Sequence, residues 1–330
     1  MPRLYPAIFS TILLLLVGCQ EIERIAEQRE QAKLQARSAE ISAELGAESL
    51  VLPAASETLG KLYYVHVKAS EVRFLPDEKP FASDLDDDAR TLIEERIKEI
   101  AAKNDPTSLV ILAEPGALAT VSQLKQVCDE VNLPRLVEPL LPGMKFHLAG
   151  EQRAGRGSRP ICLSWKDPPR HAQRYVFECS DGRITFLDIS RLDQGIQRIQ
   201  SEFHAKTGAL PSARQLQYLL NNNVVGDGAY RVTLELDGGV RFVYRKADPD
   251  AGELLAEMEG EASSFRAMLN NLEPQECWFY FVGRESSFDV LRYAMRDAAD
   301  AGFAFGWDAM PEDEPIVMSS GGSRCCASDE

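Results

Sequence analysis

The stretch that decides the fold runs from Cys277 to Trp307, CWFYFVGRESSFDVLRYAMRDAADAGFAFGW. Its first seven residues, CWFYFVG, are almost all apolar and predict a buried β-strand. Four apolar residues of the next stretch recur at helical spacing and predict one buried helix face: Phe288, Leu291, Met295 and Ala298. Gly302 follows where a helix ends in a left-handed residue. FAFGW then predicts a strand that closes the same sheet.

The residues before this stretch predict a hairpin and a helix. YRVTLELDGGVRFVYRK, residues 230–246, reads as two strands that turn at Asp237-Gly238-Gly239, a strong hairpin signal. Residues 251–272 predict one helix. The complete order is two strands, helix, strand, helix, strand, which defines an α+β unit with helices on one face of its sheet.

The same order occurs earlier in the chain. KLYYVHVKASEVRFLP (61–76) predicts a hairpin, residues 84–104 a helix, SLVILAE (108–114) a buried strand, and RLVEPLLP (135–142) a closing strand after a second helix. The spacing also agrees, since Val65 to Leu112 (112 − 65) and Val232 to Phe279 (279 − 232) both give 47 residues. We therefore predict an internal repeat of two small sheet-plus-helix units.

The N-terminus predicts an export signal. Residues 4–18 are uncharged and follow Arg3, but these fifteen residues fall short of the about 20 that a membrane-spanning helix needs. A short apolar run with a basic start is typical of a signal peptide. Leu16-Val17-Gly18-Cys19 resembles the lipobox of bacterial lipoproteins, which implies lipidation of Cys19 and a body outside the cytoplasm. An uncleaved short anchor and a soluble cytoplasmic protein remain as alternatives.

Residues 21–45 predict a single helix, because they lack Gly and Pro and are rich in Ala, Glu, Gln, Lys and Arg. The positions that would form a coiled-coil seam are mostly alanines, so we expect a solvated stalk, with a weak homo-oligomeric coil as the alternative. The middle of the chain holds a further hairpin, YVFECSDGRITFLD (175–188), and a helix at 192–203. These elements predict an incomplete third copy or an extra layer on the second unit.

The predicted domain boundaries follow from these elements. In chain order they are a signal peptide with lipobox (1–18), a helical stalk (19–48), a linker (49–60), unit 1 (61–145), a flexible loop (146–172), a hairpin, helix and unit 2 (173–310), and a disordered tail (311–330).

The charge restricts the partners. The 330 residues carry a formal net charge of −15, which disfavours nucleic acid and anionic lipid head groups because both are negative. In this acidic chain Trp165, Arg170 and His171 form a small basic and aromatic cluster, which we predict as a candidate partner-binding site. The alternative is a solvated loop with one anchored Trp.

No residue pattern predicts an enzyme. The four histidines lack the paired spacing of a metal site, and no serine has the setting of a nucleophile. Cys128 and Cys277 lie in apolar patterns and predict buried free thiols. We therefore expect no catalytic residue, cofactor or metal, with a thiol or hydrolytic enzyme whose site forms only in the fold as an alternative.

Two strings carry a family resemblance: TSLVILAEPGALATVSQLKQVCDEVNLPRLVEP (107–139) and the stretch from Cys277 to Trp307. Both resemble the periplasmic domain of the ExbD/TolR biopolymer-transport family. The resemblance implies an envelope protein beside a proton-driven motor complex, which binds partner proteins or peptidoglycan and often forms a homodimer. Family members carry an acidic residue in a transmembrane helix, whereas residues 4–18 contain neither Asp nor Glu.

The expected function is therefore a non-enzymatic, lipid-anchored periplasmic protein that acts as a binding or coupling component of an envelope transport complex. A structural peptidoglycan-binding or spacer lipoprotein is the alternative.

Overall fold

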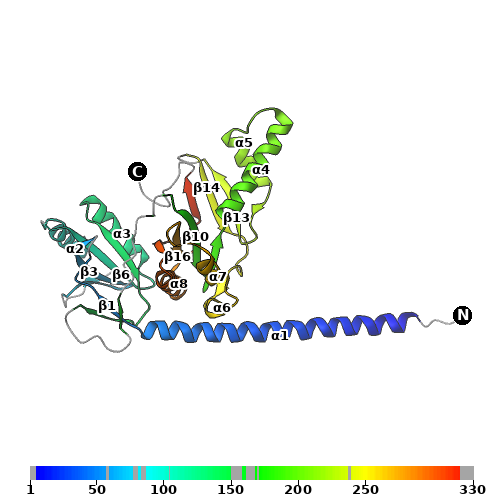
Figure 1. Ribbon diagram of the computed structural model, residues 1–330, viewed down its shortest axis with the longest axis horizontal. Helices are drawn as coiled ribbons and strands as arrows, with labels where there is room; N and C mark the ends of the chain where they lie inside the picture. The colour runs from blue at the N-terminus through cyan, green and yellow to red at the C-terminus, as the bar shows by residue number, and fades with distance from the viewer. Residues whose placement is uncertain are drawn as a thin grey trace.

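The protein has a mixed α+β fold with several sheets, which confirms the α+β part of the predicted fold class. The structure is a computed structural model, and it describes residues 5–56, 59–76, 81–82, 87–103, 105–149, 158–160, 168, 171–236 and 239–319. In residues 5–23, 81–82, 87–88, 158–160 and 319 it describes the backbone only. Figure 1 shows two sheet-containing bodies side by side and one long helix that extends away from them.

The first sheet belongs to unit 1 and has the order β5-β4-β3-β6-β7. Its strands are β3 (Gly60–Lys68), β4 (Glu71–Leu75), β5 (Phe81–Ala82), β6 (Thr107–Ala113) and β7 (Arg135–Pro139). β3 pairs antiparallel with β4 and parallel with β6, and β6 pairs parallel with β7. The helices α2 (Asp87–Ala101) and α3 (Leu118–Glu130) cover one face, where residues such as Ile97 and Val121 pack against Val65 and Ile111.

The second sheet belongs to unit 2 and has the order β15-β11-β10-β16-β17. Its strands are β10 (Gln173–Ser180), β11 (Arg183–Leu187), β15 (Glu253–Leu254), β16 (Cys277–Gly283) and β17 (Ala304–Ala309). A single 3-10 turn (Glu285–Ser287) and α8 (Phe288–Asp300) connect β16 to β17. The predicted strand, helix and strand of 277–307 are thus confirmed, and Gly302 has the expected positive φ of 84°.

The two sheets share one topology, but through a different hairpin from the predicted one. β10 pairs antiparallel with β11 and parallel with β16, as β3 does with β4 and β6. The equivalent of the 61–76 hairpin is therefore 173–187, and the equal spacing of 47 residues to the 230–246 hairpin is a coincidence. The residue pattern explains why the 230–246 hairpin is not part of the unit 2 sheet. A central strand covered on both faces is a continuous apolar run, whereas YRVTLE alternates between apolar and polar residues, as a strand with one open face does.

The 230–246 hairpin forms a separate sheet with the order β12-β13-β14-β18. Its strands are β12 (Val225–Gly226), β13 (Tyr230–Glu235), β14 (Arg241–Lys246) and β18 (Ile316–Ser319). Together with α4 (Ile189–Thr207) and α5 (Ala213–Asn222), this sheet packs on the second face of the unit 2 sheet. The tail predicted as disordered from residue 311 therefore contains a strand, because Ile316 is buried and pairs with Tyr244.

The helix predicted at 251–272 is divided. The structure has β15, then α6 (Leu255–Glu259) and α7 (Ser264–Asn271). Gly260 has an extended backbone and ends α6, and the Ser263 side chain accepts a hydrogen bond from Arg266 N and caps α7. The carboxylate of Glu253 accepts further hydrogen bonds from Ser263 Oγ and Ser264 N, both at 2.6 Å, and fixes the break.

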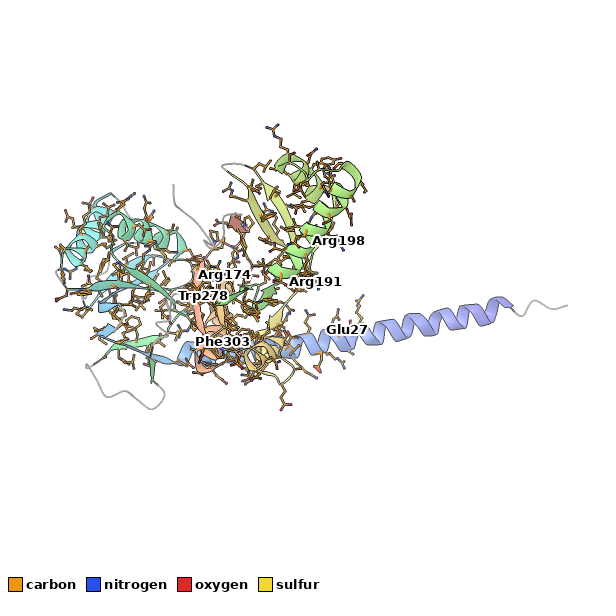
Figure 2. The ribbon with its side chains drawn as sticks, turned by 45° about the horizontal axis from the view of Figure 1, so that its top comes forward. Glu27, Arg174, Arg191, Arg198, Trp278 and Phe303 are labelled. Atoms are coloured by element: carbon orange, nitrogen blue, oxygen red, sulfur yellow. The ribbon has the colours of Figure 1, made fainter. Side chains whose placement is uncertain are left out.

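A helix, α1 (Tyr5–Ala47), contains the predicted stalk and continues through the apolar N-terminal segment. Its exposed part includes Glu27, which Figure 2 shows on α1 near the place where the helix leaves the body. Its C-terminal part is not a solvated stalk, because Ile41 and Leu45 are buried in the core. Within the described residues, no helix is both long enough and apolar enough to cross a membrane.

The predicted linker and loop also contain strands. Residues 49–60 hold β1 (Ser49–Leu52) and β2 (Ala55–Ser56). β1 is the central strand of a three-stranded parallel sheet, with β8 (Lys145–Leu148) on one side and β9 (Ser158–Pro160) on the other. Leu50 and Leu52 are buried and tie this sheet to the main core, which is why the segment is not a free linker. Most of the predicted loop at 146–172 lies outside the described residues.

One core joins all these parts. The face of the unit 1 sheet opposite α2 and α3 packs against α8, and the unit 2 sheet, α6, α7 and the end of α1 belong to the same apolar cluster. The aromatic side chains of Phe177, Phe265, Phe279 and Phe281 pack together within it, mostly edge to face, at ring-centroid distances of 5.3 to 6.5 Å. The two units are therefore parts of one packed body.

Candidate functional site

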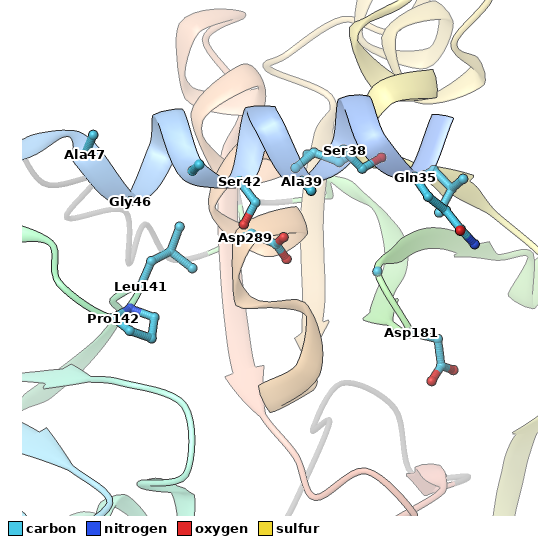
Figure 3. A pocket seen from close by; sticks show the side chains of 14 residues that line it. Gln35, Ser38, Ala39, Ser42, Gly46, Ala47, Leu141, Pro142, Asp181 and Asp289 are labelled. Carbon is cyan, nitrogen blue, oxygen red and sulfur yellow. The ribbon is translucent and has the colours of Figure 1, made fainter. Parts of the chain in front are cut away.

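A groove of about 820 Å³ lies where α1 meets the body (Figure 3). One wall is a series of small side chains on α1 between Gln35 and Ala47. The other walls come from the segment after β7, the β10–β11 turn, the start of α6 and the first turn of α8. We call this site the α1 groove, and its lining outside α1 consists of Leu141, Pro142, Asp181, Gly182, Leu254, Leu255 and Asp289.

The position of α1 beside the groove is fixed by several bonds. Arg37 donates to both carboxylate oxygens of Glu259 at the end of α6, at 2.9 to 3.1 Å. Ser38 Oγ accepts a hydrogen bond from Ala256 N at 3.0 Å, so α1 supplies a partner for a free amide in the first turn of α6. With Ile41 and Leu45 in the core, these contacts make α1 a rigid extension of the body.

The charged lining of the groove is acidic. Asp289 lies in the first turn of α8, where the helix dipole favours a negative charge, and Figure 3 shows it below Ser42 of α1. Its Oδ1 accepts only from the adjacent Val290 N among the bonds of the described residues. Asp181 forms an ion pair with Lys246, whose Nζ lies 3.9 Å away, and its side chain is 66% exposed. The groove thus presents negative charge without a strong internal cation.

A second polar feature repeats in both units, where parallel strands end. In unit 2, Glu178 of β10 accepts two hydrogen bonds from Arg284, which directly follows β16, at 2.7 and 2.9 Å. In unit 1, the ring N–H of His66 on β3 donates to Glu114, which directly follows β6, at 2.8 Å. His66 and Glu178 occupy equivalent positions in the hairpins of the two units. Glu114 and Arg284 are also equivalent, because each directly follows its parallel strand, and they are 170 residues apart (284 − 114), as are the last residues of those two strands (283 − 113).

The Glu178–Arg284 and His66–Glu114 pairs cover the ends of the parallel strands and do not form a pocket there. In unit 2 the Tyr230 hydroxyl donates to Glu178 at 2.8 Å, and burial beside that carboxylate raises the pKa of Tyr230. In unit 1 the ring of Phe146 packs edge-on against His66 with centroids 5.0 Å apart. Burial lowers the pKa of His66, although the bond to Glu114 opposes this effect. Both pairs join a second sheet to the unit, so their role is to position the sheets.

The two units also face each other with approximate reciprocity. Glu138 of β7 accepts a hydrogen bond from Arg292 of α8 at 2.8 Å, and Asp308 of β17 accepts one from Lys125 of α3 at 3.0 Å. Glu138 and Asp308 occupy equivalent positions (308 − 138 = 170). Each unit thus offers an acid on its last strand to a cation on the other unit's last helix, as the two halves of a two-fold interface do.

Side chains of unit 2 also protect the free edge of β7. Trp307 Nε1 donates to the carbonyl of Val137 at 2.9 Å, and Arg292 donates to the carbonyl of Pro139. These two carbonyls are alternate acceptors on an edge strand, which would otherwise be open to pairing with another chain. Burial raises the pKa of Glu138, and the adjacent Arg292 guanidinium lowers it.

Of the sequence-predicted site residues, His171 is the one whose side chain the structure describes. His171 is exposed, with a positive φ of 72°, just before β10. Trp165 and Arg170 lie outside the described residues, so the partner-binding cluster stays a prediction. Cys19 falls within the backbone of α1, and its side chain is not among those described. His171 is not among the residues that line the α1 groove.

The described cysteines are free and buried, as predicted for Cys128 and Cys277. Burial raises the pKa of Cys128 to about 12 and also raises the pKa of Cys179 and Cys277. A thiol acts as a nucleophile only as its thiolate, so these three groups lack the activation that thiol chemistry needs. Among the described residues, no group of three or more His, Cys, Asp or Glu is arranged to hold a metal ion.

Sequence reasoning missed the α1 groove. One signal was present, because Ser38, Ser42 and Gly46 recur every four residues and Ala39, Ala43 and Ala47 follow the same spacing. That spacing places small side chains along one helix face, where another backbone can approach closely. The acids opposite are separated from α1 by more than 130 residues of sequence, and only the fold brings them together.

Comparisons with known proteins assign no family. No family model matches the chain, and no curated protein matches it. Among solved structures, a non-polymerising MamK mutant bound to AMPPNP is similar at 12% identity, over 76% of this chain and 93% of its own, with a TM-score of 0.17. A TM-score this low supports no statement about fold or function.

Proposed function

We propose that this chain is a non-enzymatic, lipid-anchored protein of the cell envelope that binds partner proteins outside the cytoplasm. Its two units are proposed to be of the ExbD/TolR type, and the whole chain to serve as a binding or coupling component of an envelope transport complex. The support for the unit type is the shared order of hairpin, strand, helix and strand in both sheets.

The observation that carries the proposal is the way α1 enters the body. From Cys19 to Ala47 α1 has 29 residues, about 44 Å at 1.5 Å per residue, and among its described side chains those that are buried lie in the C-terminal part. Arg37, Ile41 and Leu45 hold that part against α6 and the common core. An anchor at Cys19 would therefore hold the whole body at a defined distance and orientation from a membrane, which suits a protein that presents a binding surface.

Anchoring is tested by metabolic labelling with a clickable fatty acid in bacterial cells that express the full chain or its Cys19→Ser variant. We expect label in the natural chain and none in the variant, with the natural chain in the membrane fraction after a high-salt wash. Label in neither protein removes the lipoprotein claim.

The binding role is tested by crosslinking in intact cells followed by purification of the chain. Recovery of motor-complex proteins supports the coupling role, and recovery of peptidoglycan fragments alone supports the spacer alternative instead. A matched control is the chain with Cys19→Ser, which should lose the envelope partners together with the anchor.

A further inference from the structure

We propose that the α1 groove binds a cationic, amphipathic segment of a partner protein. The inference rests on the proposed binding function and names the chemistry of the partner and the surface that takes it. The groove extends along α1 from Gln35 to Ala47, about 18 Å at 1.5 Å per residue, which accommodates about three turns of a helix.

The shape of the groove admits a backbone at close range. The wall on α1 carries Ala39, Ser42, Ala43 and Gly46, none with a side chain longer than a hydroxymethyl group. A Cβ on Gly46 would have its nearest neighbour, the Pro142 carbonyl oxygen, at 4.0 Å, so this end of the groove has room. Small side chains on a fixed helix are the surface on which a second helix or strand packs most closely.

The chemistry of the groove selects for positive charge beside apolar contacts. Leu141, Leu254 and Leu255 give it an apolar floor, and its two charged lining residues, Asp181 and Asp289, are both acidic. Arg37, beside the groove, is already bonded to Glu40 and Glu259, and Arg183, which pairs with Leu254 between β11 and β15, donates to the Gly252 carbonyl. A ligand that combines leucine-like side chains with lysine or arginine would satisfy both features.

The same charges disfavour a second copy of this chain as the occupant. The chain carries a net charge of −15, so two copies repel each other at long range, whereas a cationic segment is attracted. The occupant is therefore a basic segment from a different protein.

The test measures fluorescence anisotropy with two labelled twelve-residue peptides, one of alternating leucine and lysine blocks and one with glutamate in place of lysine. We expect the full-length chain to bind the lysine peptide in a salt-dependent manner and not the glutamate peptide. Asp181→Asn with Asp289→Asn should weaken binding about five-fold, which is the range for two partly exposed charge pairs. Glu202→Gln, an exposed acid on α4, is the matched control and should bind as the natural chain does.

A second variant separates the groove from the charge. Ala43 is exposed on the groove wall, so Ala43→Phe should fold normally, by circular dichroism, and abolish binding at any salt concentration. Equal binding of both peptides, unchanged binding by Ala43→Phe, or no binding of the lysine peptide overturns the proposal. A dimer in sedimentation that Ala43→Phe converts to monomer would assign the groove to a second copy, and also overturns it. A chain that is lipidated and crosslinks to envelope proteins but fails these tests would defeat this inference and leave the proposed function intact.

Discussion

The buried ion pair between Glu138 and Arg292 should hold the two units together, and its removal from one side gives the sharpest test of the fold. Glu138 lies on β7 and Arg292 on α8, with side chains 5% and 10% exposed and 2.8 Å between Oε1 and Nη1. Arg292→Met keeps an unbranched chain about as long as the aliphatic part of arginine and removes the charged guanidinium. The variant leaves the Glu138 carboxyl buried without a cation.

The magnitude follows from the carboxyl group. In the variant the buried carboxylate takes up a proton, and protonating a group with an ordinary pKa of 4.5 at pH 7 costs about 1.36 kcal/mol for each of 2.5 pH units, or about 3.4 kcal/mol. This value lies within the about 3–5 kcal/mol that breaking one side of a buried pair costs. At pH 5 the same calculation gives about 0.7 kcal/mol.

The sign of the pH dependence is fixed by the direction of the pKa change. Burial raises the pKa of Glu138 in the folded protein, and loss of Arg292 removes the group that opposes this rise. A carboxyl group with a raised pKa in the folded state binds more protons there than in the unfolded chain, so stability falls as pH rises through the folded-state pKa. The cost of Arg292→Met should therefore be larger at pH 7 than at pH 5, by about 2.7 kcal/mol.

The assay is equilibrium unfolding in urea, followed by far-UV circular dichroism at both pH values. Arg198→Met, on the exposed surface of α4, is the matched control and should change stability by less than about 0.5 kcal/mol. Glu138→Leu combined with Arg292→Met should restore most of the loss, because an apolar pair of similar volume replaces a buried ion pair without a stranded charge. A cost below about 1 kcal/mol at pH 7, or an equal cost at both pH values, would refute the reasoning.

Two further variants test local features. His66→Gln should reduce the loss of stability between pH 7 and pH 5. Burial lowers the pKa of His66, and a group with a lowered pKa destabilises the fold as pH falls through its ordinary value of 6.5. Urea midpoints of both proteins at the two pH values measure this effect, and an equal fall in both proteins would contradict it. Gly46→Ala should stabilise the chain by about 0.5–1 kcal/mol, because Gly46 is helical and a Cβ there meets nothing nearer than 4.0 Å; a lower urea midpoint would show that the α1 groove does not have the described shape.

Much of the local structure could be predicted from the sequence. The apolar run CWFYFVG has the length of a buried strand, and residues 288–300 have one apolar face at helical spacing, so the two patterns predicted a strand and a helix directly. Pairing between distant strands could not be predicted in the same way. The 173–187 and 230–246 hairpins both precede a buried strand, and only the burial of both faces of β10 distinguishes the true partner of β16.

The candidate site was less predictable than the fold. Small residues on α1 indicate a close contact, but the sequence does not say what they contact. The residues opposite them come from four separate segments. Asp181 lies in the β10–β11 turn and Asp289 in the first turn of α8, and the position of both depends on the packing of the two units. The equivalence of His66 with Glu178 was also hidden, because the two positions share a place in the topology and not a residue type.

The two units differ in the segment that connects the hairpin to the next parallel strand, and this difference explains why α1 docks at one place. β4 and β6 of unit 1 are connected mainly by α2, whereas β11 and β16 of unit 2 are connected through α4, α5, a whole sheet, α6 and α7. α6 supplies the contacts of Glu259 and Ala256 that hold α1. Unit 1 lacks these elements at the equivalent place among the described residues, so α1 can dock on unit 2 only. The two units thus share one topology and meet in a nearly symmetric interface. The docking of α1 and the α1 groove break this symmetry.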